Sequence, residues 1–292
     1  MTAVLYDAPG PRARRRNLLL GVIGVALLLG VAGFIVYRFA VTGQFDPRVW
    51  EWILYENIQL LLLDALLNTL SAFVVAAILA LVFGAVFAAG RLSEHRWISG
   101  PATAVVEFFR AVPLLILIFI LYFGVSRGLG VSISAFTALV LGLMLYNGSV
   151  LAEVFRAGVV SLPRGQSEAA YALGMRKTQV MTNVLLPQAL RAMLPTIVSQ
   201  LVVVLKDTAL GFLILYPELL YQARFLGSQG QLGSPIIPVA MVIAAIYITM
   251  CLLLSQFAHY LERRSRRTRR IDPGAPVDDT EIEMQQVRAA TP

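Results

Sequence analysis

Six apolar blocks set the strongest limit on what this chain can fold into. They lie at about 17–40, 66–90, 103–125, 133–157, 193–216 and 235–260. A helix rises about 1.5 Å per residue, so about 20 residues cross the roughly 30 Å of hydrocarbon in a bilayer. Hydrophobic residues make up 58% of the chain and charged residues only 14%, whereas soluble domains carry about 25% charged residues. We therefore expect an all-α, polytopic membrane protein with about six transmembrane helices.

The basic residues that flank the blocks predict the orientation of the chain in the membrane. If the N-terminus is cytoplasmic, 17 flanking lysines and arginines fall on the cytoplasmic side and four fall outside. Cytoplasmic loops of membrane proteins carry the excess of lysine and arginine. The distribution therefore predicts that both termini, and the segment between about 161 and 191, are cytoplasmic.

The blocks divide the chain into four regions. Residues 1–16 form a basic cytoplasmic arm, and residues 17–65 form an extra N-terminal helix with an external segment. Residues 66–262 form the main membrane domain, and residues 263–292 form a cytoplasmic tail. The first block is too long for a signal peptide and has no evident cleavage site, so we expect an anchor helix. The polar tail is expected to be disordered. In the external segment, a short helix along the membrane surface is expected from its interfacial aromatic residues, Trp50, Trp52 and Tyr55.

A polar insert, SLPRGQSEAAYALGMRKTQVMTNVLLPQALRAMLP from Ser161 to Pro195, stands between two apolar blocks. Ser161 and Pro163 can start a helix, and Gly174 suits the left-handed turn that ends one. A second short helix is expected after Gly174, with Pro187 and Pro195 interrupting the approach to the next block. Such a helix–glycine–helix knob is either an amphipathic loop resting on the membrane or a docking element for a soluble partner.

Part of this insert, EAAYALGMRKTQVMTNVLLP, resembles the EAA loop of bacterial ABC importer permeases. The matching positions are Glu168, Ala169, Ala170, Gly174, Val184, Leu186 and Pro187. Val184 replaces the usual isoleucine. The likeness extends from about residue 62 to 262, and it is to permeases for polar amino acids such as histidine, glutamine, glutamate, arginine and opines. The stretch LYNGSVLAEVFRAG is most similar to actinobacterial glutamate permeases.

This resemblance implies the fold of a type I ABC importer transmembrane domain over residues 66–262, with a cytoplasmic coupling helix. In that family the loop enters a groove of the ATP-binding subunit. Glu168 would then meet that subunit and Gly174 would permit the sharp turn. Leu186 and Pro187 would begin the return into the membrane.

The resemblance also implies a set of partners. They are two copies of an ATP-binding subunit, a second permease subunit that is related but not identical, and an extracellular substrate-binding protein. ATP and Mg²⁺ would be held by the ATP-binding subunit, so this chain is expected to bind no cofactor itself.

Lys206 and Asp207 are the most deeply placed charges in the apolar blocks. A charge at the bilayer centre costs about 2.5–3.5 kcal/mol on insertion scales, so such residues usually face protein or water. Neighbouring helical residues point about 100° apart, so these two are not expected to pair with each other. Lys206 could meet a substrate carboxylate, Asp207 an ammonium group, and Thr208 could supply a hydroxyl; alternatively both charges pair with neighbouring helices. Asn147 is expected to hydrogen-bond another helix or to line the pathway.

Two further pairs of charges, Glu107–Arg110 and Glu153–Arg156, are spaced i, i+3 near the cytoplasmic ends of their blocks. Residues at this spacing are neighbours on a helix surface. We expect either ion pairs at an inner gate or contact of Glu153 and Arg110 with the substrate. Pro113 is expected to kink its helix and free backbone carbonyls.

Several activities are disfavoured by what the sequence lacks. It has no P-loop ending in Gly-Lys-Ser/Thr, so we expect a non-catalytic subunit that does not hydrolyse ATP. His95 and His259 are too isolated to predict a metal site, and Cys251 is the only cysteine, which excludes an intrachain disulfide. The basic residues lie at membrane edges without aromatic stacking partners, which argues against nucleic-acid binding.

The favoured function is that of a permease subunit in an ATP-driven importer in the bacterial plasma membrane, for glutamate or a related polar amino acid. One alternative is a secondary transporter driven by Na⁺ or H⁺ through Glu153, Lys206 and Asp207. A second is an ABC permease for basic amino acids or opines. A third is a membrane anchor that uses the polar insert only to dock a partner.

Overall fold

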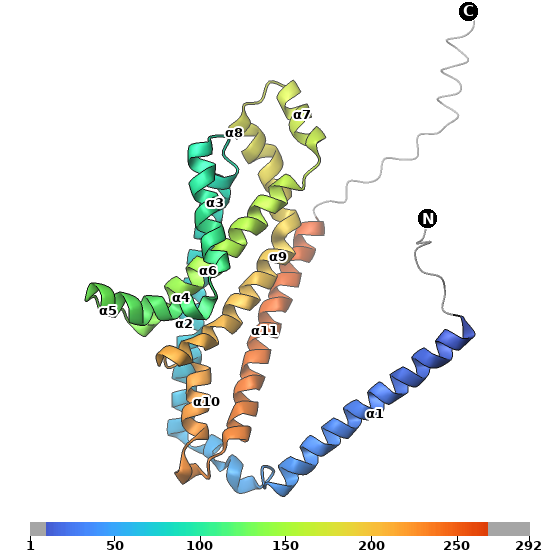
Figure 1. Ribbon diagram of the computed structural model, residues 1–292, viewed down its shortest axis with the longest axis vertical. Helices are drawn as coiled ribbons and strands as arrows, with labels where there is room; N and C mark the ends of the chain where they lie inside the picture. The colour runs from blue at the N-terminus through green and yellow to red at the C-terminus, as the bar shows by residue number, and fades with distance from the viewer. Residues whose placement is uncertain (1–9, 268–292) are drawn as a thin grey trace, which may run out of the picture. The chain divides into compact units, whose positions relative to one another are not determined.

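The computed structural model of the protein describes residues 10–267, and every regular element in that range is a helix (Figure 1). The α-helices are α1 (Pro11–Val41), α2 (Glu56–Arg91), α3 (Arg96–Ala111), α4 (Leu114–Phe119), α5 (Val125–Leu129), α6 (Ala135–Val160), α7 (Arg164–Ala172), α8 (Lys177–Gln179), α9 (Leu186–Asp207), α10 (Leu219–Gly227) and α11 (Ile236–Arg267). The 3₁₀ and π-helical segments are η1 (Pro47–Leu54), η2 (Ile120–Gly124), η3 (Val180–Leu185), η4 (Thr208–Ile214) and η5 (Gly230–Leu232). The expected all-α class is confirmed.

The described residues form two compact units. The smaller unit contains residues 10–64 and 222–244, and the larger contains residues 65–221 and 245–267. Every candidate site residue named from the sequence lies in the larger unit. The predicted arm and tail fall partly outside the described residues. The described end of the arm is helical, because α1 already starts at Pro11, and the described start of the tail is helical, because α11 continues to Arg267.

The number of membrane-crossing helices agrees with the sequence. Within residues 10–267, five helices are long and apolar enough to span a bilayer: Pro11–Val41, Glu56–Arg91, Ala135–Val160, Lys177–Ile214 and Ile236–Phe257. The bent pair Arg96–Ala111 and Leu114–Leu129 is also long and apolar enough when its two parts are taken together, which gives up to six spans. The prediction of about six spans is confirmed.

The start of the second span was predicted wrongly. α2 begins at Glu56 rather than near residue 66, and the short helix expected before it is η1 alone. Hydropathy marks the apolar part of a helix, whereas the helix itself continues until a breaker stops it, and no proline or glycine occurs between Pro47 and Gly84. Trp52 was expected to face the membrane–water interface, but its side chain is buried in the protein.

The third span is broken at Pro113. Its two parts, α3 and the helical run that begins with α4, meet at an angle of 99°. A residue before proline is pushed out of the helical region, and Val112 has an extended backbone with φ −81° and ψ 126°. The predicted kink is therefore confirmed, and it is a complete break of the helix.

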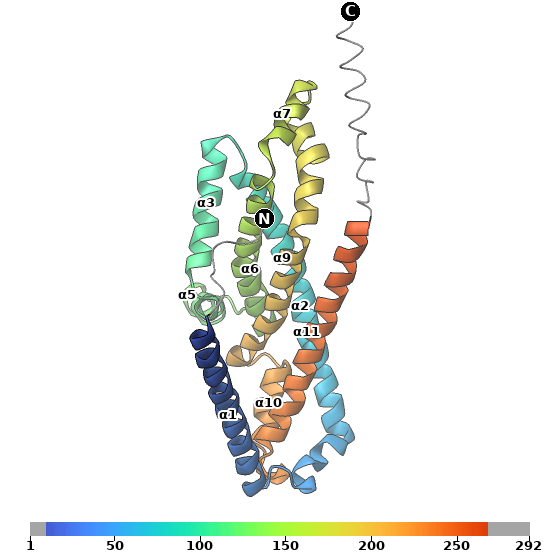
Figure 2. The ribbon, with the colours of Figure 1, turned by 90° about the vertical axis from the view of Figure 1, so that its right-hand side faces the viewer.

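α6 is the central helix of the larger unit. It packs against α3, α4 and α9, and both views show it beside α9 (Figure 1, Figure 2). Leu139, Leu143 and Leu151 of α6 are fully buried. A Cβ placed on Gly148 would lie 2.8 Å from the ring of Phe83 in α2. Small residues let membrane helices approach this closely, so the sequence of α6 allows it to pack tightly against its neighbours.

Candidate functional site

The first half of the polar insert folds as predicted. α7 follows Pro163, and its last turn ends at Gly174, whose φ is +77°. The N–H of Gly174 donates to the carbonyl of Tyr171 at 2.9 Å, and the N–H of Met175 donates to that of Ala170 at 3.2 Å. This pair of bonds is the Schellman motif, which favours glycine because a left-handed residue ends the helix.

The second half of the insert differs from the prediction. α8 continues through the π-helical turn η3 into α9, so Lys177–Ile214 forms one continuous run instead of a separate short helix. Pro187 lies in the first turn of α9. Proline lacks an N–H and its ring crowds the carbonyl of the preceding turn, which the wider π-turn accommodates. Pro195 lies inside α9, so neither proline interrupts the helix.

α7 presents a mixed surface that the sequence reasoning only partly identified. Glu168 and Ala169 are exposed, as a docking role requires, whereas Ala170 is buried. Tyr171 is 49% exposed and Leu173 is 83% exposed within the described residues. Both were missed, although an apolar side chain directly before a helix-ending glycine in a polar segment was a usable signal. Large exposed apolar side chains grouped together indicate an interaction surface.

Charged residues from three helices meet at Arg91, the last residue of α2. Its guanidinium Nη1 lies 2.7 Å from Oε2 of Glu153 in α6, and its Nη2 lies 3.3 Å from Oε1 of Glu107 in α3. Arg110 pairs with Glu107 at 3.3 Å, and Arg156 pairs with Glu153 at 2.6 Å. The two i, i+3 ion pairs are thus formed. The sequence reasoning did not predict that Arg91 joins them.

A polar cluster links α6 to α9 at the fully buried Asn147. Gln200 donates from Nε2 to Oδ1 of Asn147 at 2.7 Å, and Asn147 donates from Nδ2 to Oδ2 of Asp207 at 3.4 Å. The expected hydrogen bond from Asn147 to another helix is therefore present. Thr208 is also buried, and its hydroxyl donates to the carbonyl of Leu205 at 2.6 Å.

Lys206 has a different environment from Asp207. It is exposed and lines a cavity of about 520 Å³ with residues of α9, α10 and α11. It is the only charged side chain among the described residues that line this cavity. Lys206 and Asp207 do not pair with each other or form any other ion pair in the described part of the chain. The cavity wall therefore offers one cationic group in a largely apolar setting.

A buried carboxylate stabilises the wall of this cavity. Glu218 is fully buried and accepts hydrogen bonds from the backbone N–H groups of Leu220 and Tyr221 at 2.8 and 2.7 Å. The hydroxyl of Tyr247 in α11 donates to its Oε2 at 2.8 Å. Buried charges in folded proteins are hydrogen-bonded in this way. Glu218 thus fixes the start of α10 to α11, and neither it nor Tyr247 was identified from the sequence.

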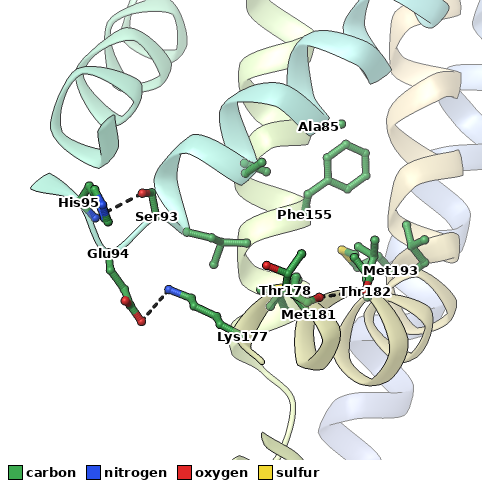
Figure 3. Close-up of a pocket in the computed structure, with 16 residues that line it drawn as sticks. Ala85, Ser93, Glu94, His95, Phe155, Lys177, Thr178, Met181, Thr182 and Met193 are labelled. Carbon is green, nitrogen blue, oxygen red and sulfur yellow. Dashed lines mark hydrogen bonds and ion pairs between the residues drawn. The ribbon is translucent and has the colours of Figure 1, made fainter. Parts of the chain in front are cut away.

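A second cavity, of about 580 Å³, lies between the end of α2, α6 and the run from α8 into α9 (Figure 3). Phe155, Met181 and Met193 contribute to its apolar walls. At its rim, Nζ of Lys177 lies 2.6 Å from Oε1 of Glu94. The hydrogen bond and charge of Lys177 hold the pKa of Glu94 below its usual value. The polar insert is thereby joined to the turn that follows α2.

Comparisons of the sequence with known proteins identify a family of transport proteins. Residues 80–267 match the family described as binding-protein-dependent transport system inner membrane component. The chain is 40% identical over 230 residues to the glutamate transport system permease protein GluD of Corynebacterium glutamicum, covering 78% of this chain and 83% of that protein. It is 34% identical over 201 residues to the probable glutamine ABC transporter permease protein GlnP of Bacillus subtilis, covering 69% of this chain and 92% of that protein.

Solved structures give the same result for the fold. A crystal structure of an amino acid ABC transporter with histidines contains a chain that is 31% identical, with a TM-score of 0.66, covering 71% of this chain and 95% of that one. The expected type I ABC importer fold is thus confirmed. Since the family match covers more than half of its residues, the chain belongs to the family of binding-protein-dependent transport system inner membrane components, the permease subunits of ABC importers.

Proposed function

We propose that this chain is the permease subunit of an importer for a polar amino acid, with glutamate as the first candidate. The likeness to GluD, a glutamate permease, at 40% identity supports glutamate. The likeness to a probable glutamine permease supports the wider class of polar amino acids. Transport of a basic amino acid or of an opine instead of glutamate is an alternative outcome of the test below.

The observation that carries the proposed mechanism is the exposed surface of α7. Leu173 is 83% exposed and stands directly before Gly174, whose positive φ ends the helix. An ATP-binding subunit that covers Leu173 and meets Glu168 would turn movement caused by ATP into movement of α6 and α9, between which the insert lies. Such transfer requires an element with two arrangements that ATP binding can bias.

The proposed complex contains this chain, a related but non-identical permease, two ATP-binding subunits and an extracellular binding protein. ATP and Mg²⁺ belong to the ATP-binding subunits, and this chain binds no cofactor. The polar insert and both termini are on the cytoplasmic side of a bacterial plasma membrane, as the excess of arginine on those segments supports.

Within the transport pathway, Lys206 is the best candidate for substrate contact. It faces a cavity and has no carboxylate partner in the described residues, so it can meet a substrate carboxylate. Four of the other candidates are already engaged: Arg110 and Glu153 in ion pairs, and Asn147 and Asp207 with each other. We assign these four residues to support of the pathway.

Uptake of labelled glutamate, and of labelled arginine and an opine in parallel, by cells tests this function. Cells that express the full set of subunits should accumulate glutamate, and loss of the ATP-binding subunit should abolish accumulation even when the ion gradients are intact. Uptake that survives this loss but stops with a protonophore would instead show an ion-coupled secondary transporter. Binding of the ATP-binding subunit without uptake of any amino acid would leave only a docking role.

A further inference from the structure

We propose that the last residue of α2 and the turn after it, from Arg91 to Glu94, form a second mechanical link between the polar insert and the transport helices, with Arg91 as its positioning residue. This link rests on the proposed function, because it acts on movement that the ATP-binding subunit delivers to the insert. It adds a connection through α2 to the direct connections of the insert with α6 and α9.

The first half of the link is the contact of Arg91 with two other helices. Its guanidinium is within 2.7 Å of Glu153 in α6 and 3.3 Å of Glu107 in α3, and its side chain is only 9% exposed. A buried charge that loses its partners is strongly unfavourable. Any displacement of Arg91 must therefore carry Glu107 and Glu153 with it or break both contacts.

The second half of the link is the contact of Glu94 with Lys177 in α8, where Oε1 and Nζ are 2.6 Å apart. The connection from Arg91 to Glu94 is short and ordered by hydrogen bonds. The N–H of Leu92 donates to Ala88, and the N–H of Ser93 donates to Gly90. Movement of α8 can thus reach Arg91 through a single turn of chain.

The surroundings of this contact leave room for the movement. Figure 3 shows the pair of Glu94 and Lys177 at the rim of the cavity, with Phe155, Met181 and Met193 deeper inside. The cavity of about 580 Å³ lies between α2 and the run from α8 into α9. Part of the facing surfaces is therefore not packed together, and the ion pair bridges the gap.

The test uses the complete complex in proteoliposomes and measures labelled glutamate imported per ATP hydrolysed, together with the amount of ATP-binding subunit that co-purifies. Arg91→Gln should lower import per ATP by about tenfold, within the usual range of coupling between sites, while the ATP-binding subunit stays bound. Arg91→Lys should retain more import per ATP, because it keeps the charge. Arg96→Gln is the matched control, since Arg96 is exposed and makes no ion pair with any residue that the structure describes.

Charge reversal at the exposed pair tests the link without disturbing a buried residue. Glu94→Lys and Lys177→Glu should each lower import per ATP by about two- to fivefold, the range of an exposed ion pair. The double variant should restore it. A role of either residue that does not depend on the attraction between the two side chains would give no such restoration.

The outcomes separate this link from the proposed function. Absence of uptake by the wild-type complex would overturn both. Normal wild-type uptake with Arg91→Gln equal to Arg96→Gln would overturn the link alone. Failure of the double variant to recover import per ATP, or loss of the ATP-binding subunit from every variant at Lys177, would also overturn it, because Lys177 would then belong to the docking surface.

Discussion

Gly158 of α6 lies directly against Met193 of α9. A Cβ added to Gly158 would overlap the Sδ and Cγ atoms of Met193, which is itself buried. The contact joins the two helices that flank the polar insert, near the end of α6. A side chain at this position would therefore require the side chain of Met193 to move.

Replacing Gly158 by alanine should destabilise the protein by about 1 kcal/mol, the low end of the usual cost of overpacking, because the flexible side chain of Met193 borders a cavity into which it can move. Thermal unfolding in detergent measures this, and the same Gly158→Ala change made in a Met193→Ala variant should cost less, because the overlapping atoms are gone. Gly100→Ala is the control, because nothing lies within 4 Å of a Cβ at that helical position. Equal stability of the Gly158 and Gly100 variants would contradict the close approach.

Gly174→Ala should weaken binding of the ATP-binding subunit. A non-glycine residue in the left-handed region costs about 1–2 kcal/mol, and Gly174 has a φ of +77°. Gly174→Asn should have a smaller effect, because asparagine tolerates this conformation. The amount of ATP-binding subunit that co-purifies with each variant measures these effects, and it should fall from wild type to Gly174→Asn to Gly174→Ala. Gly165→Ala, in the same insert and with open space around its Cβ, should behave as wild type. An equal loss at both glycines would mean that the turn is unimportant.

Leu173→Ser should lower the affinity for the ATP-binding subunit by about tenfold or more, because full burial of a leucine is worth about 1.5–3 kcal/mol. The side chain is 83% exposed within the described residues, so the variant should leave the folding of the permease unchanged. Leu129→Ser is a matched control, since Leu129 is 74% exposed on a different element, α5. Normal binding by the Leu173 variant would remove this residue from the docking surface.

Lys206→Ala should reduce uptake by about tenfold without loss of the ATP-binding subunit, because a hydrogen bond to a charged group is worth about 1.5–3 kcal/mol. Lys206→Arg keeps the charge in the cavity and should retain more uptake. Arg191→Ala serves as control, since Arg191 is the other cation of α9 and is exposed. Unchanged transport kinetics in Lys206→Ala would assign this residue to structure alone.

Local signals in the sequence were sufficient for much of the fold. Block length predicted the spans, Pro113 predicted the break, and Gly174 predicted the turn after α7. The i, i+3 spacing of Glu153 and Arg156 placed their side chains on one helix face, where they meet at 2.6 Å. In each case the cause lies within a few residues of chain, which is why a sequence alone can reveal it.

Features that depend on distant segments were not predictable in this way. Arg91 looked like an ordinary basic residue at a membrane edge, and only the packing of α2 against α3 and α6 gives it two carboxylate partners. The partner of Glu218 is Tyr247, which lies on another helix. Pro187 looked like a helix breaker because the sequence does not reveal the π-turn that accommodates it.

The measurement that tests the central claim most directly is the ATPase activity of the complete complex in proteoliposomes. The binding protein is included, and glutamate, glutamine, aspartate, arginine and histidine are added one at a time. We expect glutamate with its binding protein to stimulate ATP hydrolysis, which would establish both the energy source and the substrate. Stimulation by none of the five amino acids, with all subunits present and assembled, would contradict the proposed function.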